Sequence, residues 1–404
     1  MKRIQLEGNT KKFTIIDGLY LLVIALFSGV CYELFYRMCI RFNDKYRSDF
    51  EWYINLPTSE YKEKHRLIGW ALDLMYRNGI EVKGMVVMFA VTIACIILVN
   101  YAYISFFTKD ISKNRTAREL FSGIMLFIGP IYVPVIHEYY YRWSFQSFAW
   151  HSPTQQEMIL FSIISVICFV KLYENSEDTI AWKWWIATAI TVFLSTFSKP
   201  AFAIDLMLAT VVLFLMDLFV RNGEKLSSKF VKRFLMGLSL VPSAIYLLII
   251  VKYNFNGEDE LQQASVNFTI EHLKKYPNLG AAIVCGLAFS IVVWLANTNL
   301  LKEKRYRTII VIFVIGVLQW SVLREGGVRE RHGNFAWGRQ VACYLLTLTS
   351  IAIAINNWNE KDFLKDKALI RKLYFALLGF LLILHVGSQL RYFYMICRGH
   401  SYLC

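Results

Sequence analysis

Residues 84–107 of the chain read GMVVMFAVTIACIILVNYAYISFF, a run of apolar and small side chains without one charged residue. At a rise of about 1.5 Å per residue, a helix of this length can cross the roughly 30 Å of hydrocarbon in a lipid bilayer. Backbone amides inside a bilayer find no water to bind, so such a segment is expected to be helical. This stretch therefore predicts a transmembrane helix and sets the class of the protein.

The composition of the whole chain indicates the same class. Of 404 residues, 56% are hydrophobic and 18% are charged, and the mean hydropathy is +0.41. A soluble domain of this length carries more charge and shorter apolar runs. We expect an all-α polytopic membrane protein in which residues 1–404 form a single membrane domain.

About eleven transmembrane helices are predicted. They cover residues 13–32, 84–107, 120–136, 157–173, 183–197, 201–220, 234–251, 279–296, 308–323, 339–355 and 373–390. The segments 120–136 and 183–197 are short, so a re-entrant structure is the alternative for each of them.

Basic residues in the short loops predict the orientation, because cytoplasmic loops carry an excess of Lys and Arg. We expect a protein of the plasma or inner membrane. Its basic loops alternate correctly with the spans, which places the N-terminus in the cytoplasm. The acidic loop at residues 174–178 is the exception to this alternation. The formal net charge of +14 is therefore mostly a topology signal and an attraction to anionic lipid, and we expect no nucleic-acid partner. The basic loops are residues 2–12, 109–118, 221–233, 302–307 and 361–372.

The first extracytoplasmic loop, residues 33–83, contains an acidic pair, Asp49 and Glu51. Carboxylates outside the bilayer, in a chain that is otherwise an apolar scaffold, are the best candidates for acid–base chemistry. Residues 60–78 of the same loop have apolar side chains at helical spacing with Lys and Arg on the flank. They predict an amphipathic helix that lies in the membrane interface, with its basic residues near lipid phosphates.

Two other extracytoplasmic segments carry polar side chains. Trp150-His151-Ser152-Pro153-Thr154 is typical of a helix start, because proline is tolerated in the first helical turn; a capped turn without further function is an equal interpretation. Ser198-Lys199-Pro200 predicts a tight turn that holds one ammonium group at the membrane surface. The alternative for Lys199 is a lysine that only snorkels to water.

The segment 324–338 is predicted to be a basic, glycine-rich extracytoplasmic loop. Its guanidinium groups suit phosphate or pyrophosphate, because the planar fork of arginine binds oxyanions through two hydrogen bonds. The side chains that carry this prediction are Arg324, Arg329, Arg331 and His332.

These residue types together favour the transfer of a group from a lipid-linked phosphate donor to a hydroxyl acceptor. A carboxylate would remove the acceptor proton, and cations would stabilise the departing phosphate. The sequence has no P-loop and no glycine-rich nucleotide fingerprint, so we expect the membrane to present the donor.

With these segments the chain resembles the GT-C class of integral-membrane glycosyltransferases. Their first extracytoplasmic loop carries an acidic D-x-D-like signature and an interfacial helix, and Asp49-Phe50-Glu51 and residues 60–78 occupy those places. The resemblance covers most of the chain. It implies a polyprenyl-phosphate-sugar donor, an inverting displacement at the anomeric carbon, and a cell-envelope glycan or protein acceptor on the extracytoplasmic face. No W-W-D-Y-G motif is present, so transfer to asparagine is not expected.

From charge and side we assign Asp49 as the general base. Glu51 is expected to assist it, or to bind acceptor hydroxyls or a divalent cation such as Mg²⁺ or Mn²⁺. Two carboxylates without a third ligand at fixed spacing do not define a metal site, so metal dependence stays open. Donor phosphate is assigned to Arg324, Arg329, Arg331 and Lys199, and secondary contacts with the acceptor to His151, His332 and Trp52.

Two alternatives remain from the sequence. A polymerase or ligase for lipid-linked polysaccharide shares the size, the number of spans and the extracytoplasmic arginines, although its long polar loop usually lies later in the chain. A transporter or flippase would need ionisable residues buried within spans. The candidates for such residues are Asp205, Asp217 and His385.

Overall fold

The structure is a computed structural model of the chain. It describes residues 14–41, 48–55, 57, 66–110, 112–135, 150, 152–176, 179–219, 226–255, 265–271, 273, 278–326, 334–365 and 367–399. Four of the predicted site residues, His151, Arg329, Arg331 and His332, lie outside the described residues.

Helices dominate the described part of the chain, as predicted. The longest are α1 (Ile15–Tyr36), α4 (Val82–Phe107), α6 (Pro153–Asn175), α8 (Ala201–Phe219), α12 (Lys304–Val322), α13 (Asn334–Asn359) and α14 (Ala368–Cys397). The shorter helices are α2 (Asp49–Asn55), α3 (Leu67–Arg77), α5 (Arg115–Ile124), α7 (Trp182–Ser198), α9 (Leu226–Gly237), α10 (Val241–Phe255) and α11 (Leu279–Leu295). Single turns of tighter or wider helix are η1 (Arg37–Arg41), η3 (Met125–Phe127), η5 (Leu238–Leu240) and η8 (Thr298–Lys302), and two strands, β1 (Ser265–Phe268) and β2 (Leu323–Gly326), pair antiparallel.

Within the described residues, 8 helical stretches are long and apolar enough to cross a membrane, which supports a polytopic integral membrane protein. The predicted count of about eleven is not confirmed. Helices α7 and α11 have 17 residues each, which is the lower limit for a span. The segment 120–136 is not one helix, because α5 ends at Ile124 and residues 128–133 are not helical.

The backbone after α5 is held by two other helices, which fits the re-entrant alternative for this segment. The Ile131 N–H donates to the Cys285 carbonyl at 2.9 Å. The His385 Nδ1 donates to the Gly129 carbonyl at 2.6 Å, and its Nε2 accepts from the Phe289 N–H at 3.4 Å. Non-helical backbone at membrane depth must be satisfied by protein, so His385 has a structural task.

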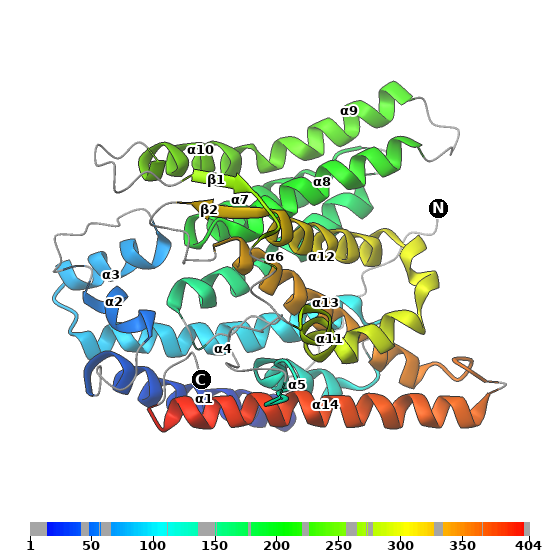
Figure 1. Cartoon of the computed structure of the whole chain (residues 1–404), viewed down its shortest axis with the longest axis horizontal. Coiled ribbons are helices and arrows are strands. Elements are labelled where there is room, and N and C mark those ends of the chain that lie inside the picture. Colours follow the sequence, from blue (N-terminus) through cyan, green and yellow to red (C-terminus); the bar gives the residue numbers. More distant parts are fainter. Residues whose placement is uncertain are drawn as a thin grey trace.

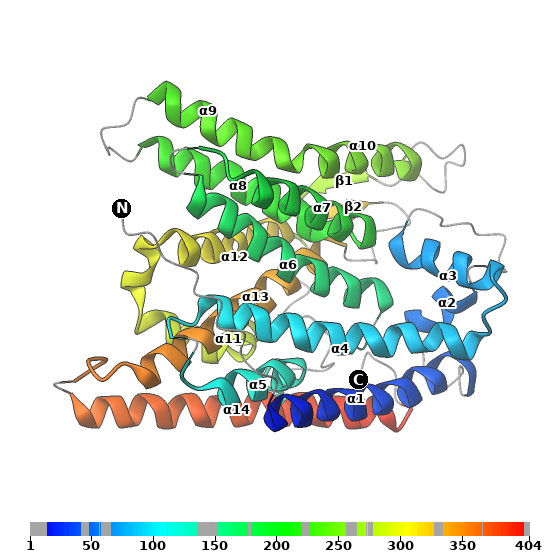
Figure 2. The ribbon, with the colours of Figure 1, turned by 180° about the vertical axis from the view of Figure 1, so that it is seen from behind.

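Figure 1 shows the long helices side by side, with α13 crossing the middle, α1 and α14 along one edge, and α9 and α10 along the opposite edge. Figure 2 gives the same arrangement from behind. Helix α13 packs against α12, α8, α11 and α4 and forms the centre of the core. The outer faces of α1 and α14 leave apolar side chains such as Leu26 and Ile383 exposed, as helices that face lipid require.

Helices α2 and α3 and the strand pair gather toward one end of the bundle, at the left in Figure 1 and at the right in Figure 2. We call this the α2–α3 end. Helix α3 corresponds to part of the interfacial helix predicted over residues 60–78, of which residues 60–65 lie outside the described residues. It buries Ile68 and Leu72 and packs on α2, α6 and α7. Arg66, expected near lipid phosphates, donates a hydrogen bond to the Tyr53 hydroxyl.

Candidate functional site

The acidic pair lies on a helix and not in an irregular loop. Asp49 begins α2, and Phe50 anchors that helix. Its ring stacks on Phe35, with ring centres 4.5 Å apart, and meets Phe89 edge to face, with ring centres 5.1 Å apart. Successive residues of a helix are rotated by about 100°, so Asp49 and Glu51 project in nearly opposite directions. The two carboxylates therefore do not converge on one atom.

No metal centre is evident in the part of the chain that the structure describes. Groups of three or more His, Cys, Asp or Glu side chains that could hold an ion do not occur among these residues. Since Asp49 and Glu51 point apart, they do not supply two ligands to the same ion without further groups.

The predicted helix start after Trp150 is confirmed. Ser152 is the N-cap of α6 and Pro153 is its first residue, where the missing proline N–H costs nothing. One turn further, Glu157 is buried, and Oε2 of its carboxyl group has no hydrogen-bond partner. Helices α2, α3 and α7 all contact α6, so the first turns of α6 connect the acidic helix to the Ser198-Lys199-Pro200 turn.

Lys199 points into the protein. It is 9% exposed, and its ammonium lies 3.7 Å from the centre of the Trp337 ring. A cation on an aromatic face gains roughly 2 kcal/mol when it is shielded from water. The snorkelling alternative is therefore wrong, because the side chain is buried against α13.

The segment 324–338 is more ordered than a glycine-rich loop. Arg324 lies in β2 opposite Asn267 of β1, and residues 334–338 are the first turns of α13. Residues 327–333 lie outside the described residues. The first residues of the segment are extended because β2 pairs with β1. The Thr269 N–H, which follows β1, donates to the Val322 carbonyl, which precedes β2, and so extends this pairing.

Arg339 is the second buried cation at this end. It is 3% exposed, and its guanidinium lies 4.0 Å from the centre of the Trp320 ring of α12. Its neighbour in the chain, Gln340, receives a hydrogen bond from Gln155 of α6 at 3.5 Å. The first turns of α13 thus carry Trp337 and Arg339, and the free backbone N–H groups of a helix start add partial positive charge nearby.

A carboxylate lies at the same meeting of helices. Asp205 of α8 is 1% exposed, and neither of its oxygens has a hydrogen-bond partner. Gly316 of α12 and Gly338 of α13 make room for it, because a β-carbon at position 316 would lie 3.1 Å from Asp205 Oδ2, and one at position 338 would overlap that oxygen. The structure therefore brings Asp205, Lys199 and Arg339 to the same junction of α7, α8 and α13.

The other ionisable groups named for the transporter alternative are satisfied. Asp217, at the opposite end of α8, accepts from the Tyr173 hydroxyl at 2.7 Å and forms ion pairs with Arg233 at 2.9 Å and Arg307 at 3.2 Å. His385 holds backbone, as described above. Asp217 and His385 are therefore both paired within the protein.

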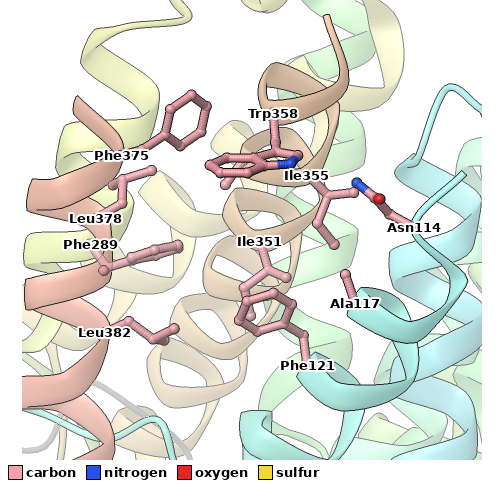
Figure 3. Close-up of a pocket in the computed structure, with 12 residues that line it drawn as sticks. Asn114, Ala117, Phe121, Phe289, Ile351, Ile355, Trp358, Phe375, Leu378 and Leu382 are labelled. Atoms are coloured by element: carbon pink, nitrogen blue, oxygen red, sulfur yellow. The ribbon is translucent and has the colours of Figure 1, made fainter. Parts of the chain in front are cut away.

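A cavity of about 330 Å³ lies far from this junction, between α5, α11, α13 and α14. Figure 3 shows Phe121, Phe289, Trp358 and Phe375 around it and Asn114 at its border. None of its described lining residues is ionisable. It suits an apolar chain and provides no group for acid–base chemistry.

Sequence reasoning assigned Lys199 and the arginines of the segment 324–338 to one phosphate group and named Asp205 only for the transporter alternative. It did not name Arg339 or Glu157 as site residues. A charged residue inside an apolar span is a signal for a site, and Asp205 has that signal. Comparison with known protein families finds no family model that matches this chain, and no curated protein matches it significantly.

Proposed function

We propose that the chain is an integral-membrane glycosyltransferase that moves a sugar from a polyprenyl-phosphate donor to a hydroxyl acceptor, with its site at the α2–α3 end. The observation that carries the proposal is the pair of buried cations, Lys199 and Arg339, on the faces of Trp337 and Trp320. Preorganised cations in a site shielded from water stabilise a departing phosphate strongly.

The reaction assigned to this site is a displacement at the anomeric carbon. The acceptor hydroxyl oxygen forms a bond to that carbon on the face opposite the phosphate, and the bond between the carbon and the phosphate oxygen breaks. The electron pair leaves with the lipid phosphate, which Lys199 and Arg339 stabilise. Asp49 takes the acceptor proton as general base. Inversion at the anomeric carbon follows from attack on the opposite face.

The arrangement of helices supports a shared site for base and cations. Helix α2, which begins at Asp49, contacts α6. Helix α6 in turn packs against α7, which ends at Ser198, next to Lys199. Because Asp49 and Glu51 project in different directions, we assign the base to Asp49 alone and an acceptor contact to Glu51. Arg324, in β2, is kept as a contact to donor phosphate.

The test is incubation of purified chain in lipid nanodiscs with radiolabelled polyprenyl-phosphate monosaccharides and a membrane extract as the source of acceptor. We expect label to move to an acceptor with the native chain and not with Asp49→Asn, while both proteins unfold at the same temperature. Full transfer by Asp49→Asn removes the base assignment. Transfer only from lipid-diphosphate oligosaccharides would favour the polymerase or ligase alternative.

A further inference from the structure

Asp205 is a buried carboxylate whose chemistry the mechanism above does not use. It lies on α8, four residues after Ala201 and hence about 6 Å inside the α2–α3 end of that helix. Both of its oxygens are buried without a hydrogen bond. Leaving a buried polar group unsatisfied costs roughly 1–3 kcal/mol, and more for a charged one. A group kept at that cost is expected to bind something that the protein itself does not supply.

Gln319 shares this condition at the same junction. It is 5% exposed, and neither its amide nitrogen nor its amide oxygen has a hydrogen-bond partner. It lies three residues after Gly316 on α12, and residues at this spacing lie on the same face of a helix. That face meets α8, because a β-carbon at position 316 would lie 3.1 Å from Asp205 Oδ2. Asp205 and Gln319 therefore line one junction of α8, α12 and α13.

The hydrogen-bonding needs of the two side chains restrict the ligand. Asp205 has a carboxyl oxygen that needs a donor, and Gln319 needs one donor and one acceptor. A phosphate group offers only acceptors, so the carboxyl oxygen of Asp205 and the amide oxygen of Gln319 would both stay without a donor. A cation offers no acceptor to Gln319 and would lie near Arg339. Neighbouring hydroxyl groups of a sugar supply both donors and acceptors, and they satisfy both side chains.

We propose that Asp205 and Gln319 bind hydroxyl groups of the transferred sugar. This inference rests on the proposed function, because it assigns the phosphate and the sugar of one donor molecule to two neighbouring sets of residues. Lys199 and Arg339 hold its phosphate, and Asp205 and Gln319 hold its sugar. Gly316 and Gly338 are required at their positions, because a side chain at either one would fill the space beside the Asp205 carboxylate.

A pair of matched ligands tests this division. Farnesyl phosphates that carry glucose, mannose or N-acetylglucosamine are compared with farnesyl phosphate alone. For each ligand, the unfolding temperature of the full chain in nanodiscs is measured as a function of ligand concentration. Ligand that binds the folded protein raises that temperature by an amount that grows with the logarithm of the ratio of ligand concentration to Kd. The native chain is expected to bind at least one sugar-bearing lipid more tightly than farnesyl phosphate.

The variants are Asp205→Asn and Gln319→Met, both close in shape to the native side chain. Each is expected to bind farnesyl phosphate as the native chain does and to bind the sugar-bearing lipid at least about tenfold more weakly. Lys199→Gln is expected to weaken both ligands. Asp362→Asn, an exposed change at the opposite end, is expected to change neither. Because Gln319 has no partner to lose, Gln319→Met keeps the test informative if Asp205→Asn folds poorly.

Native affinity for the sugar-bearing lipid in both Asp205→Asn and Gln319→Met overturns the inference, since ordered water would then satisfy these groups. Equal affinity of the native chain for farnesyl phosphate with and without sugar overturns it as well. Neither result bears on transfer itself, which is measured separately with radiolabelled donor. Sugar binding through Asp205 in a chain that transfers no label would instead contradict the proposed function and leave standing only the contact of these two side chains with sugar hydroxyl groups.

Discussion

The carboxylate of Asp205 occupies the space that a β-carbon at position 338 would fill, so α8 and α13 approach each other through an acid and a glycine. This contact lies next to Trp337, whose ring carries the Lys199 ammonium. The exact size of residue 338 therefore decides whether the acid, the cation and the start of α13 can occupy their places together.

We predict that Gly338→Ala lowers the unfolding free energy by about 1–3 kcal/mol, because the added methyl group overlaps Asp205 Oδ2 and forces a shift. Chemical unfolding in detergent measures this cost. Gly387→Ala on α14 is the control, because nothing lies within 4 Å of its added carbon. It is expected to be neutral or to stabilise the helix by about 1 kcal/mol. Equal effects of the two substitutions would show that the contact at Gly338 is not tight.

Asp205 and Asp217 provide a second contrast within one helix. Asp217→Asn is expected to cost about 3–5 kcal/mol, because Arg233 and Arg307 lose their buried anion. Asp205→Asn is expected to be neutral or stabilising, since no protein group loses a partner. Unfolding in the same detergent measures both. A large loss of stability in Asp205→Asn would mean that the carboxylate has a structural partner.

Substitutions of Phe50 and Trp52 test the anchoring of α2 separately from its proposed part in transfer. Phe50→Ala removes a fully buried ring between Phe35 and Phe89, and we expect a loss of about 3–5 kcal/mol together with loss of activity. Trp52 is 43% exposed, so Trp52→Ala is expected to leave the unfolding temperature unchanged. It is expected to reduce transfer, because Trp52 is assigned to a contact with the acceptor. An active, stable Phe50→Ala protein would show that the position of α2 does not matter.

The side of the membrane on which α2 lies can be measured directly. In a background without the native cysteines, Trp52→Cys is expected to react with a membrane-impermeant maleimide in intact cells, whereas Asp362→Cys at the opposite end reacts only after the membrane is opened. The basic loops predict this result, because an excess of Lys and Arg is typical of cytoplasmic loops. Labelling in the reverse order would place α2 on the cytoplasmic side and would contradict the extracytoplasmic site that the proposed function requires.

The sequence predicted the class of the fold, because long uncharged runs such as residues 84–107 have few stable alternatives in lipid. It also placed the start of α6 correctly through Ser152 and Pro153. It did not predict the break after Ile124, since periodicity does not reveal that α11 and α14 satisfy that backbone. Residues 324–338 read as a loop because glycine and arginine are common in loops, yet tertiary pairing makes part of it strand and part of it helix.

The candidate site shows the same division. Lys199 was identified from its place in a turn, but its burial against Trp337 depends on residues far away in the chain. Asp205 and Arg339 are visible as charges within or beside apolar runs, and only packing shows that they are neighbours. Separations in sequence of more than a hundred residues explain why no local pattern could link them.

The most direct test of the central claim compares the lysines at the two ends of α7, each of which lies over a tryptophan. Lys199, which follows the last residue of α7, is buried on Trp337 at the α2–α3 end, and Lys183 is exposed over Trp184 at the other end. The measurement is the rate of label transfer from a polyprenyl-phosphate monosaccharide by the native chain, Lys199→Gln and Lys183→Gln. The account predicts a loss of about 100-fold or more for Lys199→Gln and native transfer for Lys183→Gln. Equal rates for all three proteins would contradict it.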